Sequence, residues 1–179
     1  VLGPLPAAVA GVALPIALAA TIGSRLLRDS DRRHSGFLWA ILALAATATG
    51  FHADVLRGAY PMRWIDASIG ATMALVLVAL GRISMRIVND ALDAAHRDGG
   101  DAPEYLARRP RRNLAIAAIA GATLSELVAP GSTIGGWLAL AVAAAVLNVL
   151  NDWHVGRALL TRWALLLYSV YWLMALGYA

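Results

Sequence analysis

Long apolar runs alternate with polar connectors along the chain, and six of the runs are close to membrane-spanning length, about 20 residues. The runs are continuous and lack the alternation of apolar and polar residues that marks a strand. The pattern therefore predicts an all-α fold, a polytopic transmembrane bundle of about six helices. The predicted spans are Leu5 to Leu26, Gly36 to Asp54, Met62 to Val88, Asn113 to Ala129, Ser132 to Leu150 and Arg162 to Ala179.

Composition supports the same class. The 179 residues are 60% hydrophobic, and the mean hydropathy is +0.66. These values indicate an integral membrane protein that is embedded in the lipid bilayer, its predicted partner. Cysteine is absent, which excludes a disulfide framework and a thiolate metal site.

The chain begins at Val1 and stops at Ala179 inside an apolar run, so we expect a single transmembrane domain, 1–179, that is a segment of a longer protein.

The arginines predict the orientation. All fifteen basic residues are arginine, and thirteen lie in the connectors after the first, third and fifth runs or at the run ends beside them, whereas Arg57 and Arg63 lie in or beside the connector after the second. Because arginine-rich connectors stay in the cytoplasm, both ends of the chain are predicted to be periplasmic. Residues 89–112 are then a cytoplasmic charged loop, whose first half extends the third span as a helix. These arginines flank apolar runs and share no soluble aromatic face, which argues against a nucleic-acid partner.

One histidine and three carboxylates fall at the predicted outer surface: His52, Asp54, Asp66 and Glu126. Ionisable groups are costly in a bilayer and should face the bundle interior or water. A histidine with carboxylates suits a divalent metal ion, so His52, Asp66 and Glu126 are candidate metal ligands. The alternative is that these charges mark helix ends and are solvated.

Polar residues also gather near the predicted inner surface. Arg82 is a candidate to hold an anionic group such as a cofactor carboxylate, because a guanidinium binds a carboxylate through two hydrogen bonds. The alternative is an arginine that reaches into the lipid headgroups. His154 is a candidate axial ligand, a proton carrier or a plain loop histidine. The chain contains no glycine-rich phosphate loop, HExxH or GxSxG motif, so no catalytic residue is assigned.

Three stretches carry a family resemblance: RLLRDSDRRHSGFLWAILALAATATGFH, ALGRISMRIVNDAL and LNVLNDWHVGRALLTRWALLLYSVYWLMALGY. In this order they resemble the central part of the NnrS family of bacterial inner-membrane proteins. The resemblance implies haem b and copper as cofactors and a role in nitric oxide or nitrosative-stress metabolism, with His52, Arg82 and His154 as possible cofactor contacts. One departure is that Ile83, Ser84 and Met85 follow Arg82, where the family usually has a proline and an aromatic-threonine pair.

Two other functions fit the same pattern. One is a proton- or cation-coupled transporter segment with a path through His52, Asp66 and Glu126. The other is a non-catalytic accessory subunit, whose small-residue helix faces pack against other membrane subunits in a larger complex.

Overall fold

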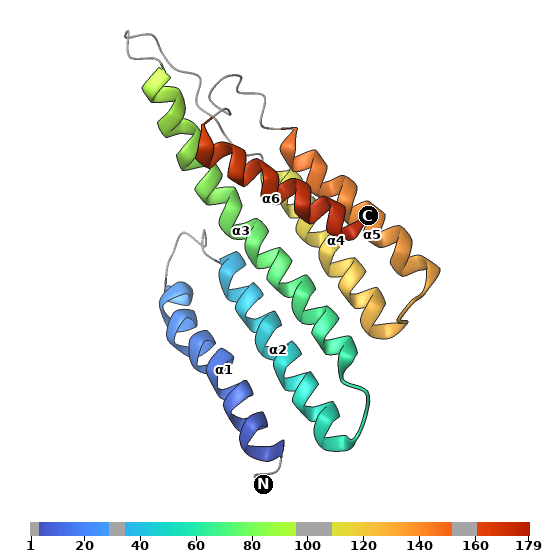
Figure 1. Ribbon diagram of the computed structural model, residues 1–179. Helices are drawn as coiled ribbons and strands as arrows, with labels where there is room; N and C mark the ends of the chain where they lie inside the picture. Colours follow the sequence, from blue (N-terminus) through green and yellow to red (C-terminus); the bar gives the residue numbers. More distant parts are fainter. Residues whose placement is uncertain (1–3, 29–34, 96–108, 152–160) are drawn as a thin grey trace. The chain divides into compact units, whose positions relative to one another are not determined.

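The computed structural model describes residues 4–28, 35–95, 109–151 and 161–179, and within these ranges the chain is helical and contains no strand (Figure 1). The described part forms six helices, which confirms the predicted all-α fold. They are α1 (Pro4–Arg28), α2 (Ser35–Arg57), α3 (Met62–Ala95), α4 (Arg109–Val128), α5 (Thr133–Leu150) and α6 (Arg162–Tyr178).

Four of these helices, α1, α2, α3 and α5, are long and apolar enough to cross a membrane. The other two are less suited: α6 has 17 residues, and α4 carries three arginines at its start and Glu126 near its end. Membrane crossing by α4 and α6 therefore stays a prediction.

Helix α3 is longer than the predicted span, because it continues past Val88 to Ala95. Its 34 residues correspond to roughly 50 Å at 1.5 Å per residue, which exceeds the hydrocarbon thickness of about 30 Å. Helix α4 begins at Arg109, so the predicted loop 89–112 overlaps both helices. Residues 96–108 between them lie outside the described part, and the cytoplasmic location of the loop stays a prediction.

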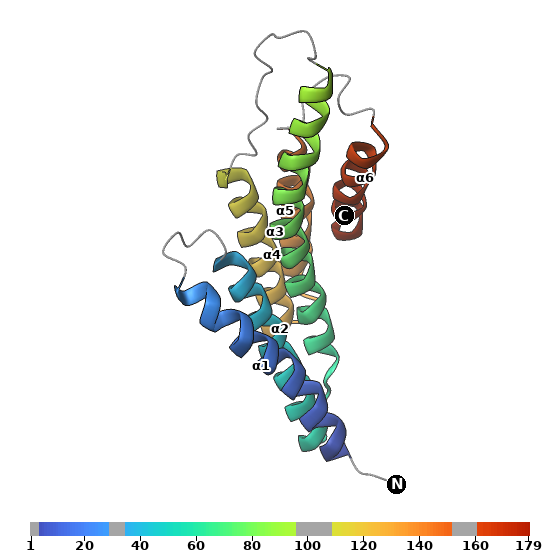
Figure 2. The same cartoon turned by 90° about the vertical axis from the view of Figure 1, so that its left-hand side faces the viewer.

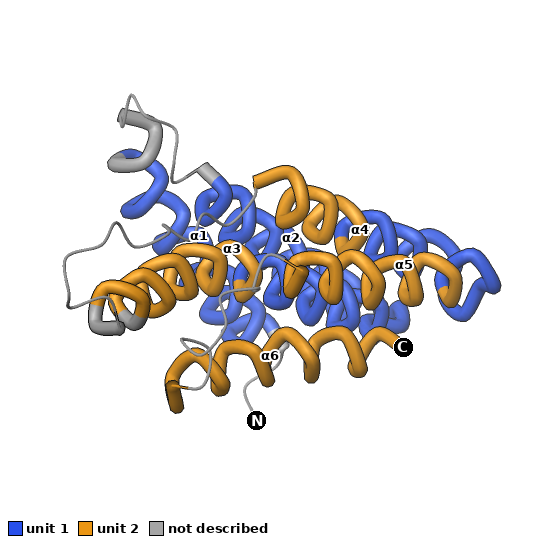
Figure 3. The backbone as a smooth tube through the Cα atoms, turned by 90° about the horizontal axis from the view of Figure 1, so that it is seen from above, with its two compact units in different colours: residues 1–75, 120–135 blue, residues 76–119, 136–179 orange. Residues whose placement is uncertain are grey.

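The chain divides into two compact units, and the division falls inside α3, α4 and the first turn of α5 (Figure 3). Unit 1 comprises residues 1–75 and 120–135, and unit 2 comprises residues 76–119 and 136–179. Each unit has its own buried residues, and the two differ in the size of these side chains.

Unit 1 is packed through small residues. Its buried apolar side chains in the described ranges are all alanines: Ala8, Ala40, Ala45, Ala67, Ala71 and Ala122. Helix α1 packs against α2, as Figures 1 and 2 show. Small residues allow helix backbones to approach closely, which is a common basis of helix association in membranes. The large side chains of α1, such as Leu5 and Val9, are exposed, as expected of a surface that faces lipid.

Unit 2 buries larger side chains. Leu77 and Val88 of α3, Ile119 of α4 and Val146 of α5 are almost completely buried. Helix α6 contributes Tyr171, which is 1% exposed. Dispersion contacts among these side chains hold the unit together, since lipid tails are as apolar as leucine and offer little hydrophobic driving force.

Substitutions at two glycines of unit 1, Gly70 and Gly121, test how closely α3 and α4 approach each other. A Cβ atom on Gly70 would overlap Thr123 Oγ1 and lie 3.1 Å from Thr123 Cβ, which no side-chain rotation can move. We expect Gly70→Ala to destabilise the protein by about 1–3 kcal/mol through overpacking. Gly121, on the same helix as Thr123, has open space around its Cβ position, so Gly121→Ala should leave stability unchanged or slightly raised. Thermal unfolding in mild detergent compares the two, and equal melting temperatures would contradict this packing.

Candidate functional site

The connector between α2 and α3 is a tight turn with defined backbone geometry. Gly58 has a φ of +69°, a left-handed conformation that ends α2 and that glycine adopts without steric cost. The Ala59 N–H donates to the Asp54 carbonyl at 2.9 Å, and the Trp64 N–H donates to the Pro61 carbonyl at 3.0 Å. These bonds bring the end of α2 close to the first turn of α3.

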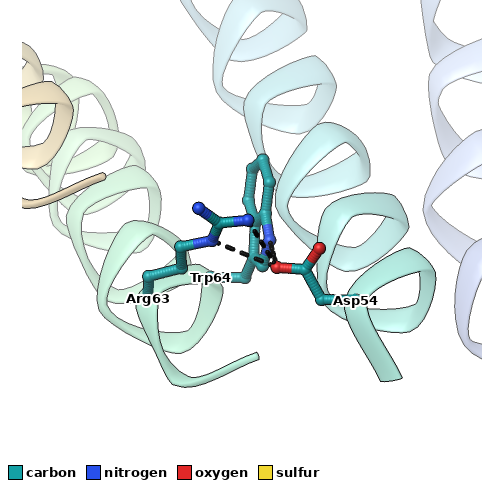
Figure 4. Close-up of polar contacts among 3 residues, drawn as sticks. All are labelled: Asp54, Arg63 and Trp64. Carbon is teal, nitrogen blue, oxygen red and sulfur yellow. Dashed lines mark hydrogen bonds and ion pairs between the residues drawn. The ribbon is translucent and has the colours of Figure 1, made fainter. Parts of the chain in front are cut away.

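Asp54, Arg63 and Trp64 form a polar cluster at this turn, which we call the Asp54 clasp (Figure 4). The Asp54 Oδ2 atom accepts three hydrogen bonds: from Arg63 Nη2 at 2.8 Å, from Arg63 Nε at 3.1 Å and from Trp64 Nε1 at 2.8 Å. The Asp54 side chain is 6% exposed, whereas that of Arg63 is 43% exposed. The clasp therefore neutralises a buried carboxylate with a guanidinium that remains partly in contact with solvent.

The clasp is held by more than its charges. A Cβ atom on Gly50 would overlap the Trp64 ring, so the absence of a side chain there lets the indole lie directly against α2. The Arg63 guanidinium carbon lies 5.6 Å from the centre of the same ring, which adds a cation–π attraction. The sequence placed Asp54 in the outer layer but did not identify its partners. The spacing in the sequence could have indicated this cluster. Asp54 is followed by a glycine turn, and an arginine and a tryptophan come nine and ten residues after the aspartate.

His52 lies on α2 and packs against α1. A Cβ atom on Gly11 would overlap His52 Nε2, so the imidazole occupies the space that this glycine leaves open. Its ring also lies edge-on to Phe51, with 5.3 Å between the ring centres. The imidazole is thus only partly exposed and contacts a neighbouring helix.

Glu126 closes the turn between α4 and α5. Its Oε2 atom accepts the Gly131 N–H at 3.1 Å, and its Oε1 atom lies where a Cβ atom on Gly135 would be. The Ser132 hydroxyl accepts the Gly135 N–H at 3.1 Å. Asp66, by contrast, is exposed on α3. The two carboxylates therefore have different surroundings, one bound to backbone and one open to solvent or lipid.

The predicted ligands do not gather into one cluster. Among the described residues, no three His, Asp or Glu side chains lie close enough to hold an ion. His52 contacts Gly11, and Glu126 contacts the turn that follows it. His52, Asp66 and Glu126 therefore do not come together as one set of metal ligands in this structure. The metal role of each residue stays a prediction.

The described residues also fall short of a haem or copper centre. His52 is the one histidine in the described ranges, since His34, His96 and His154 lie outside them, and the sequence has no cysteine. A single imidazole does not complete the ligand set that copper or a bis-histidine haem takes. No chemical step through either cofactor follows from these residues.

The predicted inner residues are only partly described. Arg82 lies on α3 in unit 2 and is half-buried. Its positive charge contributes to lowering the pKa of Arg112 on α4. His154 falls within residues 152–160, which lie outside the described part. Ser84, noted above as a departure from the family pattern, is 1% exposed and hydrogen-bonded to Tyr171 of α6. Sequence reasoning gave no indication of this contact.

Comparison with known proteins identifies the family. The NnrS family, described as NnrS protein, matches residues 1–179. The chain belongs to the NnrS family. No curated protein and no solved structure matches it. The match covers the Asp54 clasp and the Arg82 region alike, and it confirms the resemblance that the sequence indicated.

A carboxylate exchange tests the clasp. Asp54→Asn removes the charge that Arg63 and Trp64 share, and we expect a clearly lower melting temperature because a buried donor set loses its strongest acceptor. Asp66→Asn removes an equal charge at an exposed site four residues into α3, and should leave the melting temperature unchanged. A double-mutant cycle with Arg63→Gln should show that the effects of Asp54→Asn and Arg63→Gln are not additive. Additive effects would show that the two side chains do not interact.

Proposed function

We propose that this chain forms the membrane-embedded part of a bacterial inner-membrane protein that binds haem and copper and acts in nitric oxide or nitrosative-stress metabolism. The observation that carries this proposal is the family match across residues 1–179. The four helices that are long and apolar enough to cross a membrane support the location. The cofactors and the metabolic role rest on the family resemblance.

The proposed topology has six spans with both ends in the periplasm. Its support is the asymmetry of the arginines: thirteen of fifteen lie in the connectors that follow α1, α3 and α5 or in the halves of the helices that adjoin these connectors. In this orientation the Asp54 clasp lies at the periplasmic surface, and the start of α4 lies at the cytoplasmic surface. The extra length of α3 then extends into the cytoplasm.

His52 is the described residue best suited to contribute to a cofactor site. An imidazole in its neutral form is a common ligand of copper and haem iron, and His52 sits between α1 and α2 within unit 1. The remaining ligands would come from residues outside the described part. His52 also fills the space above Gly11, so its substitution must be judged by cofactor content and by stability together.

The transporter alternative has weaker support. A proton or cation path needs neighbouring ionisable groups along its course, and His52, Asp66 and Glu126 do not form a group that could hold an ion. A role as an accessory subunit remains an alternative proposal, for which the exposed apolar surfaces of α1 are compatible but equally suited to lipid.

The absorption spectrum and metal content of the purified intact protein test the proposal. We expect a Soret band and bound copper. His52→Gln should lower the haem or copper content, because it removes an imidazole while keeping a side chain of similar size. His96→Gln serves as a matched control, since His96 lies in the charged loop and is assigned no site. A protein without a Soret band and without copper would refute the cofactor assignment, and unchanged content in His52→Gln would limit His52 to packing.

A further inference from the structure

In unit 2 the positive charges of Arg82 on α3 and Arg109 on α4 both act on Arg112 of α4, and we call these three residues the arginine cluster. The Arg112 side chain lies against α3 at Gly81: its Cδ atom is 3.1 Å, and its Nη1 atom 3.5 Å, from the Cβ position of that glycine. A larger residue at position 81 would push the guanidinium away. The helices are therefore close enough to bring arginines from both into one region.

Arg112 has an unmet hydrogen-bonding requirement. Its Nε atom is buried and has no hydrogen-bond partner within the part of the chain that the structure describes. Burial, and then the positive charges of Arg82 and Arg109, lower the pKa of the guanidinium. Arginine stays charged at physiological pH all the same, so a buried donor and a concentration of positive charge persist together. A buried donor without an acceptor is costly.

Two buried hydroxyl groups of unit 2 do not supply the missing charge. Ser84 and Tyr171 are both 1% exposed, and their hydroxyl groups share a hydrogen bond. Both are neutral at pH 7. Arg112 acts electrostatically on Tyr171, but neutral hydroxyl groups cannot neutralise a guanidinium. Among the described residues, the Nε donor of Arg112 therefore has no acceptor, and an anion with a free oxygen would supply both an acceptor and the compensating charge.

We propose that the arginine cluster binds the phosphate of an anionic phospholipid headgroup, with Arg112 as the principal contact. Guanidinium groups bind phosphate oxygens through paired hydrogen bonds. Basic pockets between transmembrane helices at the cytoplasmic side are suited to such headgroups. The cluster lies on that side in the proposed topology.

The residues beside the arginines favour a lipid over a soluble phosphate. Ile83 follows Arg82 and is 47% exposed, and Leu114 follows Arg112 by two positions and is 55% exposed. These apolar side chains offer contact surface to acyl chains, which inorganic phosphate lacks. A lipid would thus satisfy the guanidinium and cover the apolar surface in one binding event.

Lipid titration of the purified intact protein in mild detergent tests the proposal. We expect phosphatidylglycerol to raise the melting temperature, and phosphatidylcholine and inorganic phosphate to have much smaller effects. Arg112→Gln should weaken the apparent affinity for phosphatidylglycerol about tenfold or more, the loss expected for one charge-assisted hydrogen bond. Arg86→Gln is the matched control, because Arg86 is an exposed arginine one turn further along α3, and it should keep the wild-type affinity.

Three results would overturn the proposal. Equal stabilisation by phosphatidylglycerol and phosphatidylcholine would show that the protein itself supplies the compensating charge. Equal stabilisation by inorganic phosphate would show a soluble-anion site. An unchanged affinity in Arg112→Gln, or a loss as large in Arg86→Gln, would show only general attraction to a charged surface. If Arg112→Gln does not fold, Arg112→Lys replaces it: it keeps the charge but loses Nε, and a wild-type lipid affinity in this variant would likewise contradict the assignment.

Discussion

A bilayer offers no hydrogen-bond partners to the backbone or to buried side chains, and this constraint accounts for most of the structure. The helices satisfy their own peptide groups, and hydroxyls within them donate to carbonyls one turn earlier. Thr49 donates to the Ala45 carbonyl at 2.8 Å, and Thr72 to the Ser68 carbonyl at 2.8 Å. Asp54 meets the same requirement with two neighbouring side chains, since its buried carboxylate is bound by Arg63 and Trp64. Within the described ranges, Arg112 is the residue with a buried side-chain donor, Nε, that has no acceptor.

Three glycines of unit 1 leave space for larger polar and aromatic side chains. His52 occupies the space beside Gly11, Trp64 lies against Gly50, and Glu126 approaches Gly135. In each case the glycine lacks a Cβ atom, so the partner side chain can lie directly against the glycine backbone. The residues that are candidates for function in this unit are therefore also packing residues. A loss of activity on their substitution needs a separate measure of stability before a chemical role can be assigned.

The sequence predicted the helices well, because continuous apolar runs and arginine-rich connectors are strong local signals. The extension of α3 past Val88 was predicted as well, because the polar segment after Val88 contains no helix breaker before Gly99, and α3 ends at Ala95. The sequence missed the partners of Asp54 and the contact between Ser84 and Tyr171. These are tertiary contacts, and the second joins residues 87 positions apart in the sequence, with no periodic pattern to reveal it. The set of His52, Asp66 and Glu126 was proposed from a shared depth, which does not require that side chains meet.

The proposed topology, read from the arginines, has the connector after α2 in the periplasm and the connector after α3 in the cytoplasm. The absence of cysteine makes a direct measurement possible, since a single introduced thiol can be labelled from one side of the inner membrane. Ala59→Cys, in the turn after α2, should react with a membrane-impermeant thiol reagent in intact spheroplasts. Gly100→Cys, in the connector between α3 and α4, should react only after the membrane is permeabilised. Labelling of both positions, or of Gly100→Cys alone, in intact spheroplasts would contradict the proposed topology.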